Sequence, residues 1–142
     1  MSHTRTVPTL TLLALAASLA CSSYAGELDH SGKTRTGKAS IYAKKFDGRK
    51  MADGTPMRLE DDNAASKTLP LGTTARVTNL ETGKSATVTI QDRGPYVAGR
   101  IVDLSPGTAR EIGLTHEQGV ARVAVEPLSL PPRPLDALRP VR

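Results

Sequence analysis

The chain of 142 residues is poor in the residue types that most often carry nucleophilic catalysis, metal binding or cross-links. It contains one Cys, three His, one Phe and no Trp. A single Cys cannot form an internal disulfide, so packing alone must hold the fold. Because His pairs at metal-ligand spacing are missing from the sequence, we predict neither a metal site nor a cofactor. With 3% aromatic residues, the core must consist mainly of Val, Ile, Leu, Ala and Met.

The length of the chain restricts the number of domains, and its charge restricts the kind of partner. A sequence of this length predicts one domain, with no room for two full cores. The formal net charge of +5, from 19 basic and 14 acidic residues, favours contact with an anionic polymer. Net charge steers the encounter but does not select the polymer.

Residues 1–25 have the features of a secretory signal peptide. Arg5 precedes an apolar run over residues 10–20, and small residues follow as far as Ala25. The run is about half of the ~20 residues that a membrane-spanning helix needs. Cleavage before Gly26 would release a soluble protein, whereas cleavage before Cys21 would leave a lipidated N-terminus; both alternatives stay open. Either one predicts export, which excludes cytoplasmic nucleic acid as the partner.

The rest of the chain divides into three parts. Residues 26–37 are polar and without periodicity and are predicted to be a linker. Residues 38–128 are predicted to form the folded domain, and residues 129–142 a Pro-rich, extended tail. Within the domain, alternating or short apolar segments predict strands at residues 38–42, 74–79, 85–91, 100–104 and 120–127.

Two local signals support this assignment. Gly83 lies where a hairpin between residues 74–79 and 85–91 needs a positive φ. Ser105 and Pro106 are typical of a helix start, and Gly113 of its end. Short strands with one helix predict a mainly β protein, a small closed barrel, because closure removes exposed strand edges.

Carboxylates are the residues left to carry acid–base chemistry. Asp92 directly follows a hydrophobic strand and precedes a rigid Arg-Gly-Pro turn, so it could act as an acid or base, or it could bind the amides of its own turn. Asp103 lies just before the helix and is interpreted as structural, since a carboxylate is stabilised there by the helix dipole. A basic loop could contact an anionic polymer or keep the surface soluble; it contains Lys44, Lys45, Arg49 and Lys50.

Residues 37–128 resemble the rare lipoprotein A family. The resemblance is carried, in this order, by GKASIYAKKFDGRKMADGT, AASKTLPLGTTARVTNLETGKS, VTIQDRGPYVAGRIVDLSPGTAREIGL and GVARVAVEPL. It implies a six-stranded double-psi β-barrel with one or two short helices, exported to the periplasm, with anchoring in the outer membrane if Cys21 is lipidated. It also implies a monomeric endolytic transglycosylase that cuts peptidoglycan strands lacking stem peptides to 1,6-anhydro ends, in cell-wall organisation or septation.

The same resemblance implies the site. The aspartate of its DRGP motif matches Asp92, which becomes the expected acid–base catalyst. Thr55, Arg58, Ser66 and Arg93 are the expected substrate-binding residues, although relatives commonly have Glu, Asp and His at the first three. Because these three positions are changed, a catalytically inactive peptidoglycan-binding or division-site scaffold is an alternative. A hydrolase would need a second carboxylate beside Asp92 at a defined separation.

Overall fold

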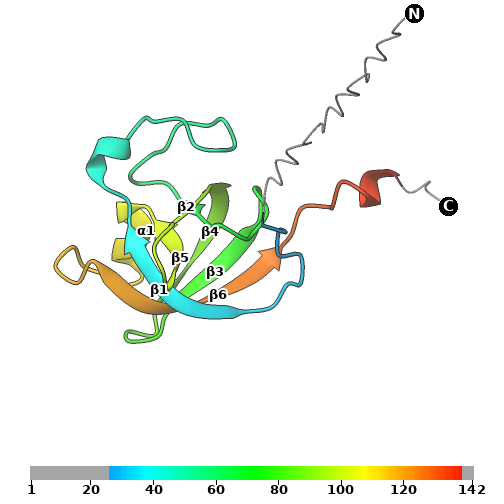
Figure 1. The fold of residues 1–142 in the computed structure, drawn as a ribbon. Coiled ribbons are helices and arrows are strands. Elements are labelled where there is room, and N and C mark those ends of the chain that lie inside the picture. The colour runs from blue at the N-terminus through cyan, green and yellow to red at the C-terminus, as the bar shows by residue number, and fades with distance from the viewer. Residues whose placement is uncertain (1–25, 139–142) are drawn as a thin grey trace, which may run out of the picture.

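The computed structural model describes residues 26–138; the predicted signal peptide, Cys21 and the last four residues lie outside that range (Figure 1). None of the helices within residues 26–138 is long and apolar enough to cross a membrane. The regular elements are β1 (Arg35–Ile41), η1 (Lys44–Phe46), β2 (Asn63–Ala65), β3 (Thr74–Asn79), β4 (Ser85–Asp92), β5 (Arg100–Leu104), α1 (Pro106–Glu111), β6 (Val120–Ser129) and η2 (Asp136–Leu138).

The strands form a closed barrel in the order β1-β5-β2-β4-β3-β6. β1 pairs with β5 and β2 with β4 in parallel, and the other neighbours are antiparallel. Closure leaves no strand edge exposed along the sheet. The expected mainly β, six-stranded barrel with one short α-helix is therefore confirmed.

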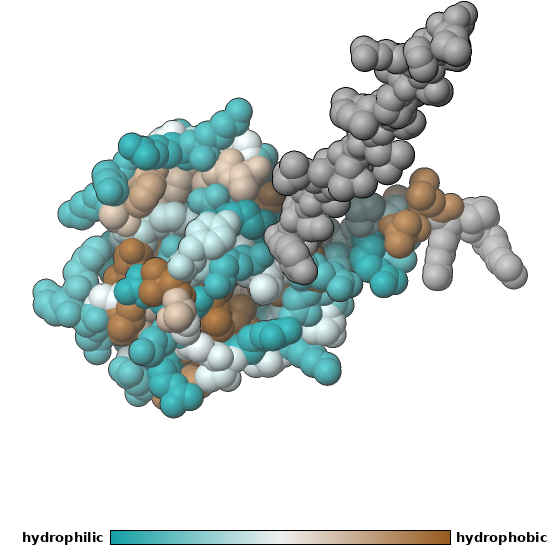
Figure 2. Space-filling model, in the orientation of Figure 1, coloured by the Kyte–Doolittle hydropathy of each residue, from teal (hydrophilic) through white to brown (hydrophobic). Residues whose placement is uncertain are grey.

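The barrel core is aliphatic, as the composition predicts. Val77, Val88, Ile90 and Val123 are fully buried, and every second residue of β3 and β4 faces inward. The buried hydrophobic residues of the described chain are Ala, Val, Ile, Leu and Met, with no aromatic among them. The face drawn in Figure 2 is mostly hydrophilic, with smaller hydrophobic areas between the hydrophilic residues.

Most predicted elements are present, with changed limits. The hairpin between β3 and β4 is confirmed, and Gly83 has a φ of 74°. β1 begins at Arg35, three residues before the predicted start, so it extends into the segment expected to be a linker. In that segment, the Asp29 amide also donates a hydrogen bond to the Thr68 carbonyl, at 2.7 Å.

β2 is the strand that the sequence does not reveal. Its three residues are all buried, because it lies in the sheet between β4 and β5. A strand of this length that is buried on both faces has no alternating pattern to detect.

The start of α1 packs directly on the loop that leads into β2. The Ser105 hydroxyl accepts a hydrogen bond from the Thr108 amide, at 3.1 Å, and donates one to the Asp61 carbonyl, at 2.5 Å. The Gly107 amide donates to the Leu59 carbonyl, at 2.8 Å. A Cβ atom on Gly107 would lie 2.9 Å from the Cα and carbonyl oxygen of Glu60, so only glycine fits there.

Gly107→Ala should lower the free energy of unfolding by about 1–3 kcal/mol, because the added methyl group meets backbone that cannot move aside cheaply. The loss is expected even though Ala is the better helix former. Urea denaturation measures it, with Glu111→Ala on the exposed face of α1 as the control that should change stability little. Equal stability of the two variants would contradict the close contact.

Candidate active site

Four residues form a row across neighbouring strands at one end of the barrel. Asp92 on β4 is the register partner of Ala65 on β2, Ala65 is the partner of Asp103 on β5, and Asp103 is the partner of Ser40 on β1. Neighbouring strands lie about 4.8 Å apart, so the Cα atoms of the two aspartates are about 10 Å apart. The barrel thus places the two carboxylates in one row, with Ala65 of β2 between them.

The carboxylate of Asp92 is held by three hydrogen bonds. The Tyr42 hydroxyl donates to Oδ2 at 2.8 Å, while the amides of Ala52 and Arg93 donate to Oδ1 at 3.0 and 2.9 Å. The sequence left open whether Asp92 would bind its own turn or act on a ligand. Only one of the three bonds comes from that turn, so most of its restraint comes from distant segments.

Tyr42 is a second member of this site. It lies directly after β1, two residues beyond Ser40, so both side chains leave the same face of that strand. Burial raises the pKa of Tyr42 far above its usual range, and the hydrogen bond to Asp92 and the negative charges of Asp92 and Asp103 raise it further. The hydroxyl group therefore remains a proton donor at neutral pH.

Asp103 is half-buried beside the Ser40 hydroxyl, which donates a hydrogen bond to its Oδ1. Burial raises the pKa of Asp103 above its usual value, and the charge of Asp92 adds to the rise. The Ser40 hydrogen bond and the positive charge of Arg100 act in the opposite direction. A neutral carboxyl group is thus favoured at this position more than in a free aspartate.

A cavity of about 220 Å³ opens beside Asp92. One wall is the ring of Tyr42, which meets the ring of Phe46 edge to face with 6.0 Å between centroids. Lys45 and Arg49 place their charges 5.4 and 5.5 Å from the centroid of Phe46. The remaining lining comes from the loop between β1 and β2, through Arg49, Lys50, Met51 and Met57.

This loop folds back on itself to reach Asp92. The amide of Gly48 donates to the carbonyl of Met57, the amide of Met57 donates to the carbonyl of Arg49, and the amide of Met51 donates to the carbonyl of Thr55, each at 2.8 Å. Met51 and Met57 are buried, which anchors the loop through apolar contacts. Its tip is thereby fixed against the end of β4, where the Ala52 amide meets Asp92.

Thr55 and Arg58 lie on the same loop but outside the cavity lining. Both residues are exposed. The Thr55 hydroxyl donates to Asp53 at 2.6 Å and accepts from the Gln91 side chain at 3.2 Å. The amide of Arg58 donates to the Asn63 side chain at 3.2 Å. Their positions leave both side chains accessible to a long ligand that passes over the cavity.

Ser66 and Arg93 have mainly internal contacts. Ser66 is buried, its hydroxyl accepts from the amides of Thr68 and Leu69, and its own amide donates to the Asp92 carbonyl at 3.1 Å. The Arg93 guanidinium donates to the carbonyls of Ser66 and Leu69 at 3.0 and 2.6 Å. These contacts fasten the segment after β2 to the strand end that carries Asp92.

Tyr42 and Phe46 carry no signal in the sequence that places them at this site. Ser105 caps α1 as predicted, whereas Asp103 contacts Ser40, 63 positions away in the chain, and not the start of the helix. No local pattern signals such a contact. Within residues 26–138, no cluster of three or more His, Cys, Asp or Glu could hold a metal ion.

Comparisons with known proteins identify the family. Residues 34–125 match the sequence model of the lytic transglycolase family, whose fold is the double-psi β-barrel. The chain belongs to this family.

The chain is also similar to individual curated proteins. The chain is 51% identical over 100 residues to the endolytic peptidoglycan transglycosylase RlpA of Pasteurella multocida, covering 70% of this chain and 34% of that protein. It is 42% identical over 99 residues to the protein of the same name from Vibrio cholerae, covering 70% and 37%. The chain thus spans about a third of the length of these relatives.

Solved structures agree on the fold. A Streptomyces papain inhibitor superposes with a TM-score of 0.54 at 24% identity, covering 69% of this chain and 96% of the inhibitor. A Clavibacter michiganensis expansin superposes with a TM-score of 0.52 at 22% identity, covering 72% and 54%. At these identities the likeness concerns the barrel alone.

Asp103→Asn should stabilise the protein increasingly as the pH rises. The folded state raises the pKa of Asp103 above its ordinary 3.8, so its contribution to stability is full below that value and is lost as the pH rises through the folded pKa. Asn cannot ionise and can still accept the Ser40 hydrogen bond. Urea denaturation from pH 3 to 7 should show that the free energy of unfolding of the variant rises relative to that of the wild type as the pH increases.

Asp47→Asn, at an exposed position on the loop after β1, is the matched control and should show no such gain. A difference between Asp103→Asn and wild type that stays constant or shrinks with pH would contradict the raised pKa.

Proposed function

We propose that this barrel is an endolytic peptidoglycan transglycosylase with Asp92 as its acid–base catalyst. The observation that carries the proposal is the Asp92 carboxylate, held by three hydrogen bonds beside a cavity of about 220 Å³. The family match and the names of the curated relatives support the reaction type. The basic and aromatic walls of the cavity suit an anionic sugar polymer.

In this reaction one carboxyl group serves twice. Protonated Asp92 gives its proton to the glycosidic oxygen as the bond to the anomeric carbon breaks. The 6-hydroxyl of the same sugar then attacks that carbon and returns its proton to Asp92. The products are a 1,6-anhydro end and a free hydroxyl on the other fragment, and no water is consumed.

The neighbours of Asp92 have supporting roles in this scheme. Tyr42 fixes the orientation of the carboxylate and remains protonated. Thr55 and Arg58 contact the glycan where it passes over the loop. Ser66 and Arg93 support glycan binding indirectly, because their contacts hold the segment after β2 in place.

Hydrolysis is the second candidate, because Asp103 shares the row with Asp92. A hydrolase uses two carboxyl groups, one as the acid and the other as a base or nucleophile. The raised pKa of Asp103 would suit the acid role. Hydrolysis would leave reducing ends instead of 1,6-anhydro ends, so the products distinguish the two reactions.

Asp92→Asn should reduce cleavage of peptide-free glycan strands by about 10²–10⁴-fold, because Asn still accepts from the two amides and can donate to the Tyr42 oxygen but cannot transfer the proton. Mass spectrometry of the products measures both the rate and the type of end. Asp136→Asn, near the C-terminus and ion-paired only with Arg133 in the described chain, is the matched control and should cut normally.

Full activity in Asp92→Asn would contradict its catalytic role. If the wild type binds strands but does not cleave them at any protein concentration, the proposed catalytic function is wrong and the inactive scaffold is supported instead.

We further propose that the protein is exported to the periplasm and acts there as a monomer on the wall, in cell-wall organisation or septation. The N-terminal segment supports export, and so does the peptidoglycan that the relatives' names give as their substrate. Anchoring through Cys21 predicts that Cys21→Ser moves the protein from the membrane fraction to the soluble fraction. Unchanged fractionation of that variant would favour cleavage before Gly26.

A further inference from the structure

A second cavity, of about 250 Å³, has the segment that follows β2 as part of its wall. Its charged rim consists of four basic residues and no acidic one: Lys33, Arg35, Lys67 and Arg100. Its apolar part is formed by Leu69, Ile101, Val125 and Pro127. No step of the proposed reaction uses this cavity.

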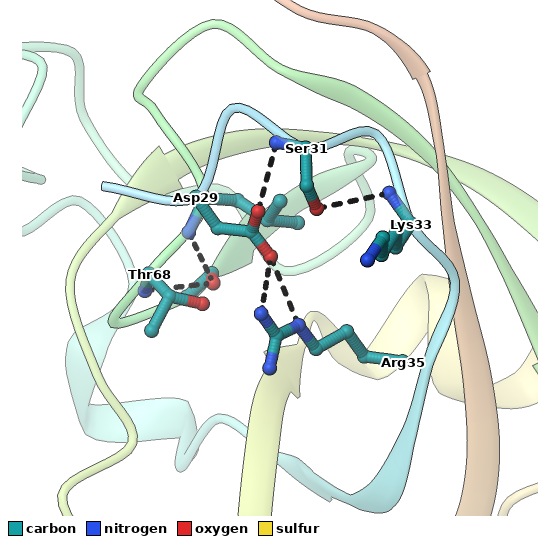
Figure 3. Close-up of polar contacts among 7 residues, drawn as sticks. Asp29, Ser31, Lys33, Arg35 and Thr68 are labelled. Atoms are coloured by element: carbon teal, nitrogen blue, oxygen red, sulfur yellow. Dashed lines mark hydrogen bonds and ion pairs between the residues drawn. The ribbon is translucent and has the colours of Figure 1, made fainter. Parts of the chain in front are cut away.

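Only one of the four positive charges is paired in the described chain. Asp29 forms an ion pair with Arg35, at 2.8 Å, and Figure 3 shows the two side chains turned toward each other beside Thr68. The Asp29 side chain is 9% exposed and that of Arg35 60%, so the pair leaves the guanidinium open to a ligand. Within residues 26–138, no carboxylate lies within 4.0 Å of Lys33, Lys67 or Arg100.

The basic cavity and the Asp92 site are connected through the segment that follows β2. Its wall includes the segment from Ser66 to Leu69, which the Arg93 guanidinium fastens to the end of β4. Arg100 on its rim is close enough to Asp103 to lower the pKa of that carboxyl group. A polymer lying over the row of aspartates therefore has a cluster of unpaired positive charges next to it.

We propose that this basic cavity is a subsite for the free lactyl carboxylate of an N-acetylmuramic acid residue, one or more sugars away from the bond that is cut. The proposal rests on the proposed function, which supplies the glycan. In a strand without stem peptides each lactyl group ends in a carboxylate, whereas a stem peptide converts it to a neutral amide. The positive rim complements the carboxylate, and the apolar part accepts the lactyl methyl group. The cavity would thus select strands that lack peptides.

Binding can be measured separately from cleavage in the Asp92→Asn background. The probes are peptide-free glycan strands and the same strands after their lactyl carboxylates have been coupled to methylamine. We expect amidation to weaken binding about fivefold, the size that two partly exposed ion pairs provide. Lys33→Gln combined with Lys67→Gln should weaken binding of the free-carboxylate strands by the same factor and leave binding of amidated strands unchanged.

Lys84→Gln combined with Arg122→Gln is the matched control, because it removes the same charge from two exposed residues that do not line the basic cavity. Lys84 lies in the turn between β3 and β4, and Arg122 lies on β6. Thermal unfolding verifies that all variants fold. Equal binding of free and amidated strands, equal losses in the two double variants, or no saturable binding of free-carboxylate strands would overturn the subsite.

Cleavage by the wild type tests the proposed function separately. Lysine-dependent binding of free-carboxylate strands without cleavage would refute the transglycosylase but retain the subsite. Cleavage of free and amidated strands with equal kcat/KM would refute the subsite but retain the transglycosylase.

Discussion

The pairing of β2 between β4 and β5 is the constraint on which the site depends. β2 pairs with β4 on one side and with β5 on the other, so its three residues hold these two strands apart and set the spacing of Asp92 and Asp103. The same pairing fixes the loop before β2, which shapes the cavity beside Asp92, and the segment after it, which forms a wall of the basic cavity. Gly107 lets α1 pack close enough to hold that loop.

Much of the fold could be predicted because its signals are local. Alternation identifies β3, β4 and β6, and the Ser105-Pro106 pair identifies α1. The start of β1 and all of β2 could not be found this way. β2 is buried on both faces, and the first residues of β1 are mostly exposed, so neither shows the alternation of a half-buried strand.

The site was predictable only where one residue carried the signal. Asp92 stands at a strand end before a rigid turn, and the family resemblance singles it out. Tyr42 and Asp103 join the site through contacts over 50 and 63 positions, which depend on barrel closure and leave no trace in neighbouring residues. The buried position of Ser66 likewise follows from the path of the chain after β2, not from its sequence neighbours.

The net charge of +5 does not show where the basic side chains lie on the folded protein. Basic side chains gather at two places: on the loop around Phe46, beside Asp92, and around the cavity lined by Lys33, Arg35, Lys67 and Arg100. The first group lies beside Asp92, and Arg100 of the second group is close enough to Asp103 to lower the pKa of that carboxyl group. An anionic glycan that lay across Asp92 would meet basic side chains of both groups, as the proposed function and the proposed subsite require.

The most direct test of this account is cleavage of peptide-free glycan strands in water labelled with ¹⁸O. A transglycosylase closes the 1,6-anhydro ring with the sugar's own hydroxyl, so mass spectrometry should find 1,6-anhydro ends and no ¹⁸O in them. New reducing ends that carry one ¹⁸O would contradict the account and show that the reaction is hydrolysis.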